Sequence, residues 1–148
     1  MSNLNYALAK TDPNVLDVIV SLDLGEEVLK VLDFYTQDIL PDAMELLEFF
    51  KGYEFAMTNK RKTLGYVNHG KKRLCINHKL MMKGYEAELM DTFIHELCHI
   101  IIRFFDPNNV TRAHGKQWKH IMKCFGYNGA MATTGGDHIS DLELGEIV

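Results

Sequence analysis

Apolar residues recur every three or four positions in several stretches of the chain, which is the spacing of one face of an α-helix. The first two stretches, residues 25–40 and 42–51, are separated by Pro41, which interrupts a helix because it lacks an N–H group and clashes with the preceding turn. Gly52 follows the second stretch, at a position where helices commonly end. The sequence therefore predicts two helices in the first third of the chain.

Three short runs of strand-forming residues follow, at residues 53–58, 63–68 and 73–77. The segments between them, 59–62 and 69–72, have the length and composition of hairpin turns. Because hairpins join neighbouring antiparallel strands, the pattern predicts a small antiparallel three-stranded β-meander.

The longest and most apolar helical pattern covers residues 85–105, where hydrophobic residues occupy most of the circumference. A helix of that kind is central and largely buried. A shorter helix is predicted at residues 116–125, and Gly126 ends it. The 148 residues are expected to form one α+β domain with four parts: a loose terminus (1–12), a helical N-terminal part (13–52), a core with the sheet and central helices (53–126) and an irregular acidic tail (127–148).

The net charge of −4 conceals a strong segregation of charge along the chain. Residues 1–54 carry a net charge of −8, residues 55–123 carry +8, and the remaining residues carry −4. Overall acidity argues against simple nonspecific nucleic-acid binding, but the basic middle segment is compatible with a local electropositive face. Six of its basic residues lie in or beside the two predicted turns: Lys60, Arg61, Lys62, Lys71, Lys72 and Arg73. They are interpreted either as solvated lysines that discourage strand aggregation or as contacts to DNA phosphates.

The three cysteines, Cys75, Cys98 and Cys124, are odd in number and form no CxxC pair, which argues against a disulfide framework and fits a reducing compartment. Residues 1–12 lack the basic start and apolar run of a secretory signal. The most apolar stretch, residues 94–105, is too short and too charged to span a bilayer. We therefore expect a cytoplasmic protein without a membrane segment.

The run His95-Glu96-Leu97-Cys98-His99 lies within the predicted central helix. Residues four apart lie one turn above the other, so His95 and His99 present two imidazoles to one point, where they can bind a single zinc ion. Glu96 is offset by about 100° and can reach a zinc-acidified water, take its proton and deliver it to a leaving amine. H-E-x-x-H is the metalloprotease signature for this reason, and chance gives it at roughly 2% in such a chain. The alternative is a buried, hydrogen-bonded histidine pair with a structural glutamate.

A catalytic zinc site needs a third protein ligand and an open fourth position. The pattern HExxHxxGxxH is excluded because Ile102 and Phe105 occupy the required glycine and histidine positions. His114 is the better candidate, since it follows His99 after a loop and stands at the start of the last helix, beside Gly115, which permits close backbone approach. A helix-capping or exposed loop histidine is the alternative for His114.

These residues resemble the SprT-like metalloproteases, the group that includes Spartan. The family pattern is HExxH, a loop and then H-G-x-x-aromatic, which matches the motif at 95–99 followed by His114-Gly115-Lys116-Gln117-Trp118. The strands Leu64-Gly65-Tyr66 and Leu74-Cys75-Ile76-Asn77 also look similar, so the resemblance covers about residues 53–126. It implies a minimal zincin-like fold, His95, His99 and His114 as zinc ligands, Glu96 as catalytic acid/base, and a role in cutting proteins crosslinked to DNA.

The leading prediction is therefore a zinc metalloendopeptidase with one Zn²⁺ ion that acts on proteins or flexible peptides, including ones bound to DNA. A nucleic-acid-associated module with a structural zinc, and a regulatory protein that acts through its acidic residues 1–51, are the competing interpretations. Tyr66 or Tyr127 could stabilise an oxyanion, and Cys98 is interpreted as a small packing residue.

Overall fold

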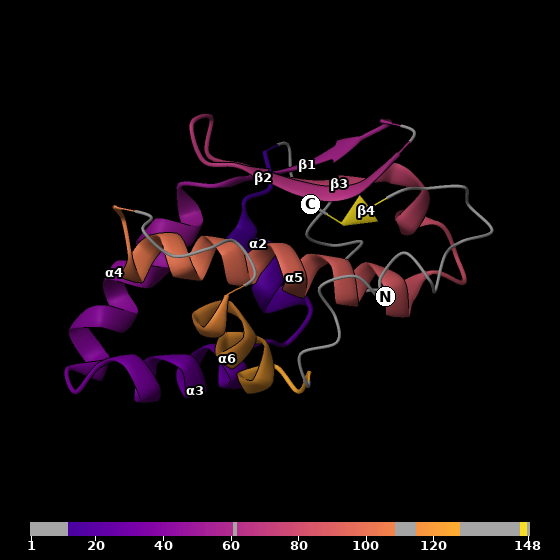
Figure 1. The fold of residues 1–148 in the computed structure, drawn as a ribbon. Coiled ribbons are helices and arrows are strands. Elements are labelled where there is room, and N and C mark those ends of the chain that lie inside the picture. The colour runs from indigo at the N-terminus through magenta and orange to yellow at the C-terminus, as the bar shows by residue number, and fades with distance from the viewer. Residues whose placement is uncertain (1–11, 61, 109–114, 128–145, 148) are drawn as a thin grey trace.

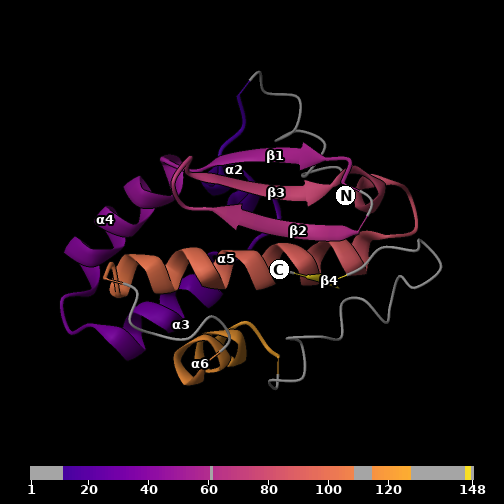
Figure 2. The ribbon, with the colours of Figure 1, turned by 45° about the horizontal axis from the view of Figure 1, so that its top comes forward.

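The computed structural model describes residues 12–60, 62–108, 115–127 and 146–147. The elements follow in this order: α2 (Val15–Ser21), α3 (Gly25–Tyr35), α4 (Ile39–Lys51), β1 (Glu54–Thr58), β2 (Thr63–Asn68), β3 (Arg73–Asn77), the 3₁₀ helix η1 (His78–Met81), α5 (Glu86–Phe105), α6 (Lys116–Cys124) and β4 (Glu146–Ile147). Helix α5 crosses the middle of the domain, with the sheet on one side and α3 and α6 on the other (Figure 1, Figure 2). The α+β class is confirmed, and no described helix is long and apolar enough to cross a membrane.

Helix α2 is not predicted by the sequence pattern, because its seven residues are too few for a clear period. A capping box fixes where it begins: the Asp17 N–H donates to the Asn14 side chain at 2.9 Å, and the Asn14 N–H donates to the Asp17 carboxylate at 3.0 Å. The Val15 N–H donates to the Tyr53 carbonyl oxygen at 2.9 Å, so the start of α2 is tied to the residue that precedes β1. Of the predicted loose terminus, residues 1–11 lie outside the described residues.

The break between α3 and α4 lies at residues 36–38, so the prediction that Pro41 interrupts the helix is wrong. Pro41 is the third residue of α4, in the first turn, where N–H groups have no partner within the helix and proline is tolerated. Thr36 makes the break instead, because its backbone is extended and its hydroxyl accepts a bond from the Asp38 N–H at 3.0 Å. The same hydroxyl donates to the Asp42 carboxylate on the first turn of α4.

The three predicted strands form within one residue of their expected bounds, but the predicted meander is wrong. The order in the sheet is β1-β3-β2-β4: β3 pairs with β2 in antiparallel fashion and with β1 in parallel fashion. Only the turn at residues 69–72 therefore joins neighbouring strands, and the segment after β1 passes over the end of β3 to reach β2 (Figure 2).

Asn77, the last residue of β3, explains this crossing. Its side-chain amide donates to the Lys60 carbonyl oxygen at 2.8 Å and to the Thr63 carbonyl oxygen at 2.9 Å, although Asn77 itself is only 1% exposed. Two backbone carbonyl groups at the crossing thus receive hydrogen bonds from a side chain of β3, the strand that the segment crosses. The last four residues of β3 are all buried, as expected of a central strand, whereas β1 has two exposed positions and lies at the edge.

Part of the predicted irregular tail is a strand. Glu146–Ile147 pairs with β2 in parallel fashion, with Glu146 opposite Thr63 and Ile147 opposite Gly65. The prediction of irregular structure is therefore wrong at β4, because a two-residue strand has no period that a sequence pattern can reveal. Residues 128–145 lie outside the described residues.

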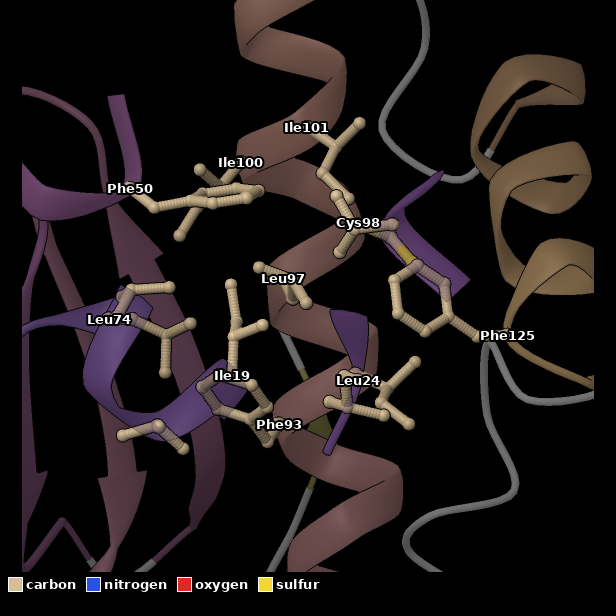
Figure 3. Packing of buried hydrophobic residues seen from close by; sticks show 14 of the residues in the cluster. Ile19, Leu24, Phe50, Leu74, Phe93, Leu97, Cys98, Ile100, Ile101 and Phe125 are labelled. Carbon is tan, nitrogen blue, oxygen red and sulfur yellow. The ribbon is translucent and has the colours of Figure 1, made fainter. Parts of the chain in front are cut away.

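Helix α5 spans Glu86–Phe105, one residue shorter than predicted, and supplies the largest share of the core. Leu97 and Cys98 of α5 belong to one buried cluster with Phe50 of α4, Ile19 of α2, Leu74 of β3 and Phe125, which follows α6 (Figure 3). The prediction of a central, buried helix is thus confirmed. The predicted helix at 116–125 is confirmed as α6, and Gly126 follows it with φ of 93°, a conformation that glycine adopts without strain.

Gly65 lies at a close approach between β2 and α5. A Cβ atom there would lie 2.8 Å from Thr92 Cγ2 and 3.1 Å from the Cys75 carbonyl oxygen, both shorter than ordinary contacts. The glycine therefore sets how closely the sheet packs on the part of α5 that carries Thr92.

We expect Gly65→Ala to lower the free energy of unfolding by about 1–3 kcal/mol, because the added methyl overpacks the contact between β2 and α5. Urea unfolding measures this loss. Thr92→Ser in the same chain removes Cγ2 and should recover part of it. Gly70→Ala is the control, since a Cβ atom there meets Asn68 Oδ1 at an ordinary 3.4 Å. Equal stability of Gly65→Ala and wild type would contradict the proposed close approach.

Candidate metal centre

His95 and His99 lie one turn apart on α5, with ring centroids 5.2 Å apart and ring planes at 69° to each other. His95 has no exposed surface, whereas His99 is partly exposed. The structure thus brings together the two imidazoles that the helical spacing predicts, at a point where the edge of the core meets solvent.

Trp118, on the first half of α6, packs against both imidazoles. Its ring centroid lies 4.8 Å from that of His95 in an edge-on arrangement and 5.8 Å from that of His99 in a stacked one. The indole N–H donates to the His95 carbonyl oxygen at 3.4 Å, and Trp118 is completely buried. The aromatic residue of the H-G-x-x-W run therefore restricts the orientation of both histidine rings, a role that its place in the apolar stripe of α6 does not reveal.

Glu96 is completely buried, and neither of its carboxylate oxygens has a hydrogen-bond partner among the described residues. Burial raises the pKa of the Glu96 carboxyl well above its usual range. Glu96 lies one turn beyond Thr92, which contacts Gly65, so this face of α5 is turned toward β2. A buried carboxyl without a partner is costly for a fold, and such groups are concentrated at functional sites.

Two adjacent faces of α5 therefore meet at the motif. The face with His95 and His99 is turned toward Trp118 of α6, and the face with Thr92 and Glu96 is turned toward the sheet. Since consecutive residues on a helix are about 100° apart, Glu96 lies beside the histidine pair without pointing in the same direction. This is the placement expected of a group that acts next to a metal without binding it.

The third predicted ligand, His114, lies outside the described residues, as do residues 109–113 before it. The next described residue, Gly115, is the N-terminal cap of α6, and Trp118 is the third residue of that helix. Within the described ranges, no three His, Cys, Asp or Glu side chains come together in a metal-binding arrangement. The assignment of His114 stays a prediction from the sequence.

The donors that are described fit a zinc ion. Two neighbouring imidazoles are ligands that zinc prefers, and the chain's third candidate is also a histidine, as in sites that combine three protein ligands with an open position. The unsatisfied oxygens of Glu96 supply an acceptor beside them. The chemistry of the residues is therefore compatible with one zinc ion.

Tyr127 makes a contact that the sequence does not reveal. Its hydroxyl donates to Asp91 Oδ1 at 2.5 Å, and Asp91 lies one turn before His95 on α5. Burial and this hydrogen bond raise the pKa of Tyr127 well above its usual value. The bond ties the chain just after α6 to the helix that carries the motif. Tyr66, the other oxyanion candidate, has Lys60 Nζ 4.4 Å from its ring centroid.

Cys98 packs inside the core, and its burial raises the pKa of the thiol well above its usual value. Its Sγ lies 3.3 Å from Met122 Sδ of α6, and no part of Cys98 is exposed. A thiol held in this way is a packing residue and not a nucleophile, as predicted.

The basic residues of the two turns lie at opposite ends of the sheet. Lys60 and Lys62 lie in the segment between β1 and β2, whereas Lys71 and Lys72 lie in the turn between β2 and β3, roughly 15 Å away along a five-residue strand. These four lysines are exposed. Arg73 pairs instead with Glu54 at 3.2 Å, and Arg61 lies outside the described residues. The structure therefore does not gather the five described basic residues into one patch.

The fold and the histidine pair are those of an α+β protein whose central helix carries an HExxH motif. The family model described as SprT-like matches residues 43–135, more than half of the chain. The protein belongs to the SprT-like family, which is generally associated with metallopeptidase activity and with zinc. Comparison with curated proteins and with solved structures gave no match.

We expect Glu96→Gln to raise the free energy of unfolding of the metal-free protein by about 1 kcal/mol at pH 7.5, because the buried carboxyl must either keep its charge without a partner or take up a proton on folding, and a neutral amide of the same shape does neither. Urea unfolding in the presence of a chelator measures the difference. Glu45→Gln, at an exposed position of α4, should leave stability unchanged. A Glu96→Gln protein less stable than wild type would show that the carboxylate has a structural role.

Proposed function

We propose that the chain is a zinc-dependent metalloendopeptidase. The observation that carries the proposal is the placement of His95 and His99 side by side on α5, next to a buried Glu96 whose oxygens have no partner among the described residues. Membership of the SprT-like family supports the same activity. His95, His99 and His114 would hold one zinc ion, which when bound supplies a Lewis acid that activates water and polarises the scissile carbonyl.

The chain's own residues would divide the remaining work. Glu96 accepts the proton of the attacking water on a carboxylate oxygen and later delivers it to the amine nitrogen that leaves. Its burial in an apolar helix excludes bulk water from the transfer. Trp118 holds the rings of His95 and His99 in a fixed relation, so the ligands are ordered before metal or substrate arrives.

Purified wild-type protein is expected to contain one zinc ion per chain, measured by elemental analysis, and to cleave fluorescently labelled casein. Glu96→Gln should keep the zinc but lower cleavage on the order of 10²–10⁴-fold, because it loses the general base. His99→Ala and His114→Ala should lose both zinc and activity. His78→Ala, at an exposed position of η1, is the control and should keep both.

Wild-type protein without stoichiometric zinc would overturn the metal assignment. Zinc retained together with equal casein cleavage by wild type and Glu96→Gln would overturn the catalytic assignment alone. Zinc without any cleavage would favour the competing function, a nucleic-acid-associated module in which the metal is structural.

We further propose that the substrates include proteins bound to DNA. The exposed lysines at the two ends of the sheet support this extension, since two points of positive charge that are separated by a strand length can contact phosphates along one nucleic-acid backbone. Arg73 contributes less than its neighbours because Glu54 already pairs with it.

Fluorescence anisotropy with a labelled 20-base-pair duplex tests this extension. We expect Lys60→Ala/Lys62→Ala and Lys71→Ala/Lys72→Ala each to weaken binding, and to reduce the salt slope by about one for every lysine removed. Lys30→Ala/Lys123→Ala, on α3 and α6, is the matched control and should change neither quantity. An unchanged affinity for the duplex after all four lysine substitutions would show that the basic turns do not contact DNA.

A further inference from the structure

A groove lies between α2, α3 and α4, the three helices that the structure describes ahead of the sheet. Its volume is about 280 Å³. Ile19, Leu32 and Phe50, all buried, form its floor, and Val20, Leu29 and Leu47 form its rim. The three rim residues are 69%, 52% and 41% exposed, so a different helix contributes each of three large apolar side chains that face both the groove and solvent.

Single exposed apolar side chains are ordinary on protein surfaces, but a cluster around one hollow is not. The rim residues surround a depression that is already lined by core side chains, so an occupant would extend the core outward. The volume lies just under the roughly 300 Å³ at which small-molecule pockets begin. It suits one or two anchor side chains from a larger partner better than a complete small ligand.

The surroundings of the groove are acidic. Residues 15–51, which contain the three helices, carry nine acidic and two basic side chains. Asp23 lines the groove, and Glu26 and Asp33 lie one turn before and one turn after Leu29 on α3. All three are exposed. Lys51, one of the two basic residues, pairs with Glu48 on α4, and nine acidic against two basic side chains leave a net charge of −7 over residues 15–51.

We propose that this groove binds an amphipathic helical segment of a partner protein, whose apolar face enters the groove and whose flanking Lys and Arg residues meet the acidic rim. Helix-in-groove binding uses apolar anchors at helical spacing, and opposite charge at the rim selects the partner and speeds association. A second copy of this chain fits less well, because a two-fold contact would place the same acidic surface against itself. The groove contains no residue of the HExxH motif, so the proposal does not depend on peptidase activity.

A phage-displayed library of random 16-residue peptides, selected on the immobilised full-length protein, supplies the probe. The most enriched peptide is then synthesised with a fluorescent label, and its Kd is measured by anisotropy at two salt concentrations. Val20→Gln/Leu29→Gln replaces two of the three apolar rim residues, both at exposed positions, and Met57→Gln/Met82→Gln is a matched control with exposed apolar residues elsewhere. Asp23→Asn/Glu26→Gln removes rim charge, and Asp12→Asn/Glu45→Gln is its control. Circular dichroism melting checks that each variant is folded.

Enriched peptides should carry apolar residues at helical spacing together with an excess of Lys and Arg. The apolar-rim variant should weaken binding at least tenfold, the charge variant should weaken it severalfold and reduce its salt dependence, and both controls should stay within twofold of wild type. The proposal is overturned by the absence of enrichment, by enriched peptides without positive charge, or by equal binding to the apolar-rim variant. A concentration-dependent dimer in light scattering that Val20→Gln/Leu29→Gln dissociates would overturn it in favour of a second copy.

Discussion

Burial of α5 is the constraint on which the rest of the structure depends. Its apolar side chains meet the sheet, α2, α4 and α6, so each of these elements is positioned by contact with the same helix. The same burial takes His95 and Glu96 out of water. Polar groups in such a place are tolerated only when they are bound, paired or functional, and Trp118 covers the histidines while Glu96 keeps its oxygens without a partner among the described residues. One helix therefore carries both the largest share of the core and a buried carboxyl group whose desolvation opposes folding.

Much of the fold follows from the sequence wherever the determining interactions are local. The period of α5 and α6, and the strand-forming runs of β1, β2 and β3, each lie within one continuous stretch, and their predicted bounds agree with the structure within one residue. The order of the strands does not follow in this way. Two turn-like segments suggested a meander, but the side chain of Asn77 holds the crossing segment seventeen and fourteen residues away in the sequence. Contacts between residues so far apart in the sequence produce no periodic pattern from which they could be predicted.

The candidate site likewise contains residues that local geometry predicts and residues that depend on tertiary packing. His95, Glu96 and His99 are predictable because helical geometry alone places residues four apart on one face. The covering role of Trp118 and the hydrogen bond from Tyr127 to Asp91 connect residues nineteen or more positions apart, and they require the packing of α6 on α5 to be known. At the break between α3 and α4 a local signal is misleading. Pro41 usually predicts the end of a helix, but in the first turn of α4 it removes no hydrogen bond within the helix.

The central position of β3 also has a consequence for how the chain is made. Both of its neighbours, β1 and β2, precede it along the chain and do not pair with each other, so no part of the sheet is complete until Arg73–Asn77 has left the ribosome. Until then β1 and β2 emerge as isolated strands with unsatisfied edges, while α2, α3 and α4 lack the surface of α5 on which they pack in the folded protein. The emergence of β3 is therefore the step that joins β1 and β2 into one sheet and provides a surface on which α5 can fold, whereas β4 adds to the edge of β2 only when the end of the chain is made.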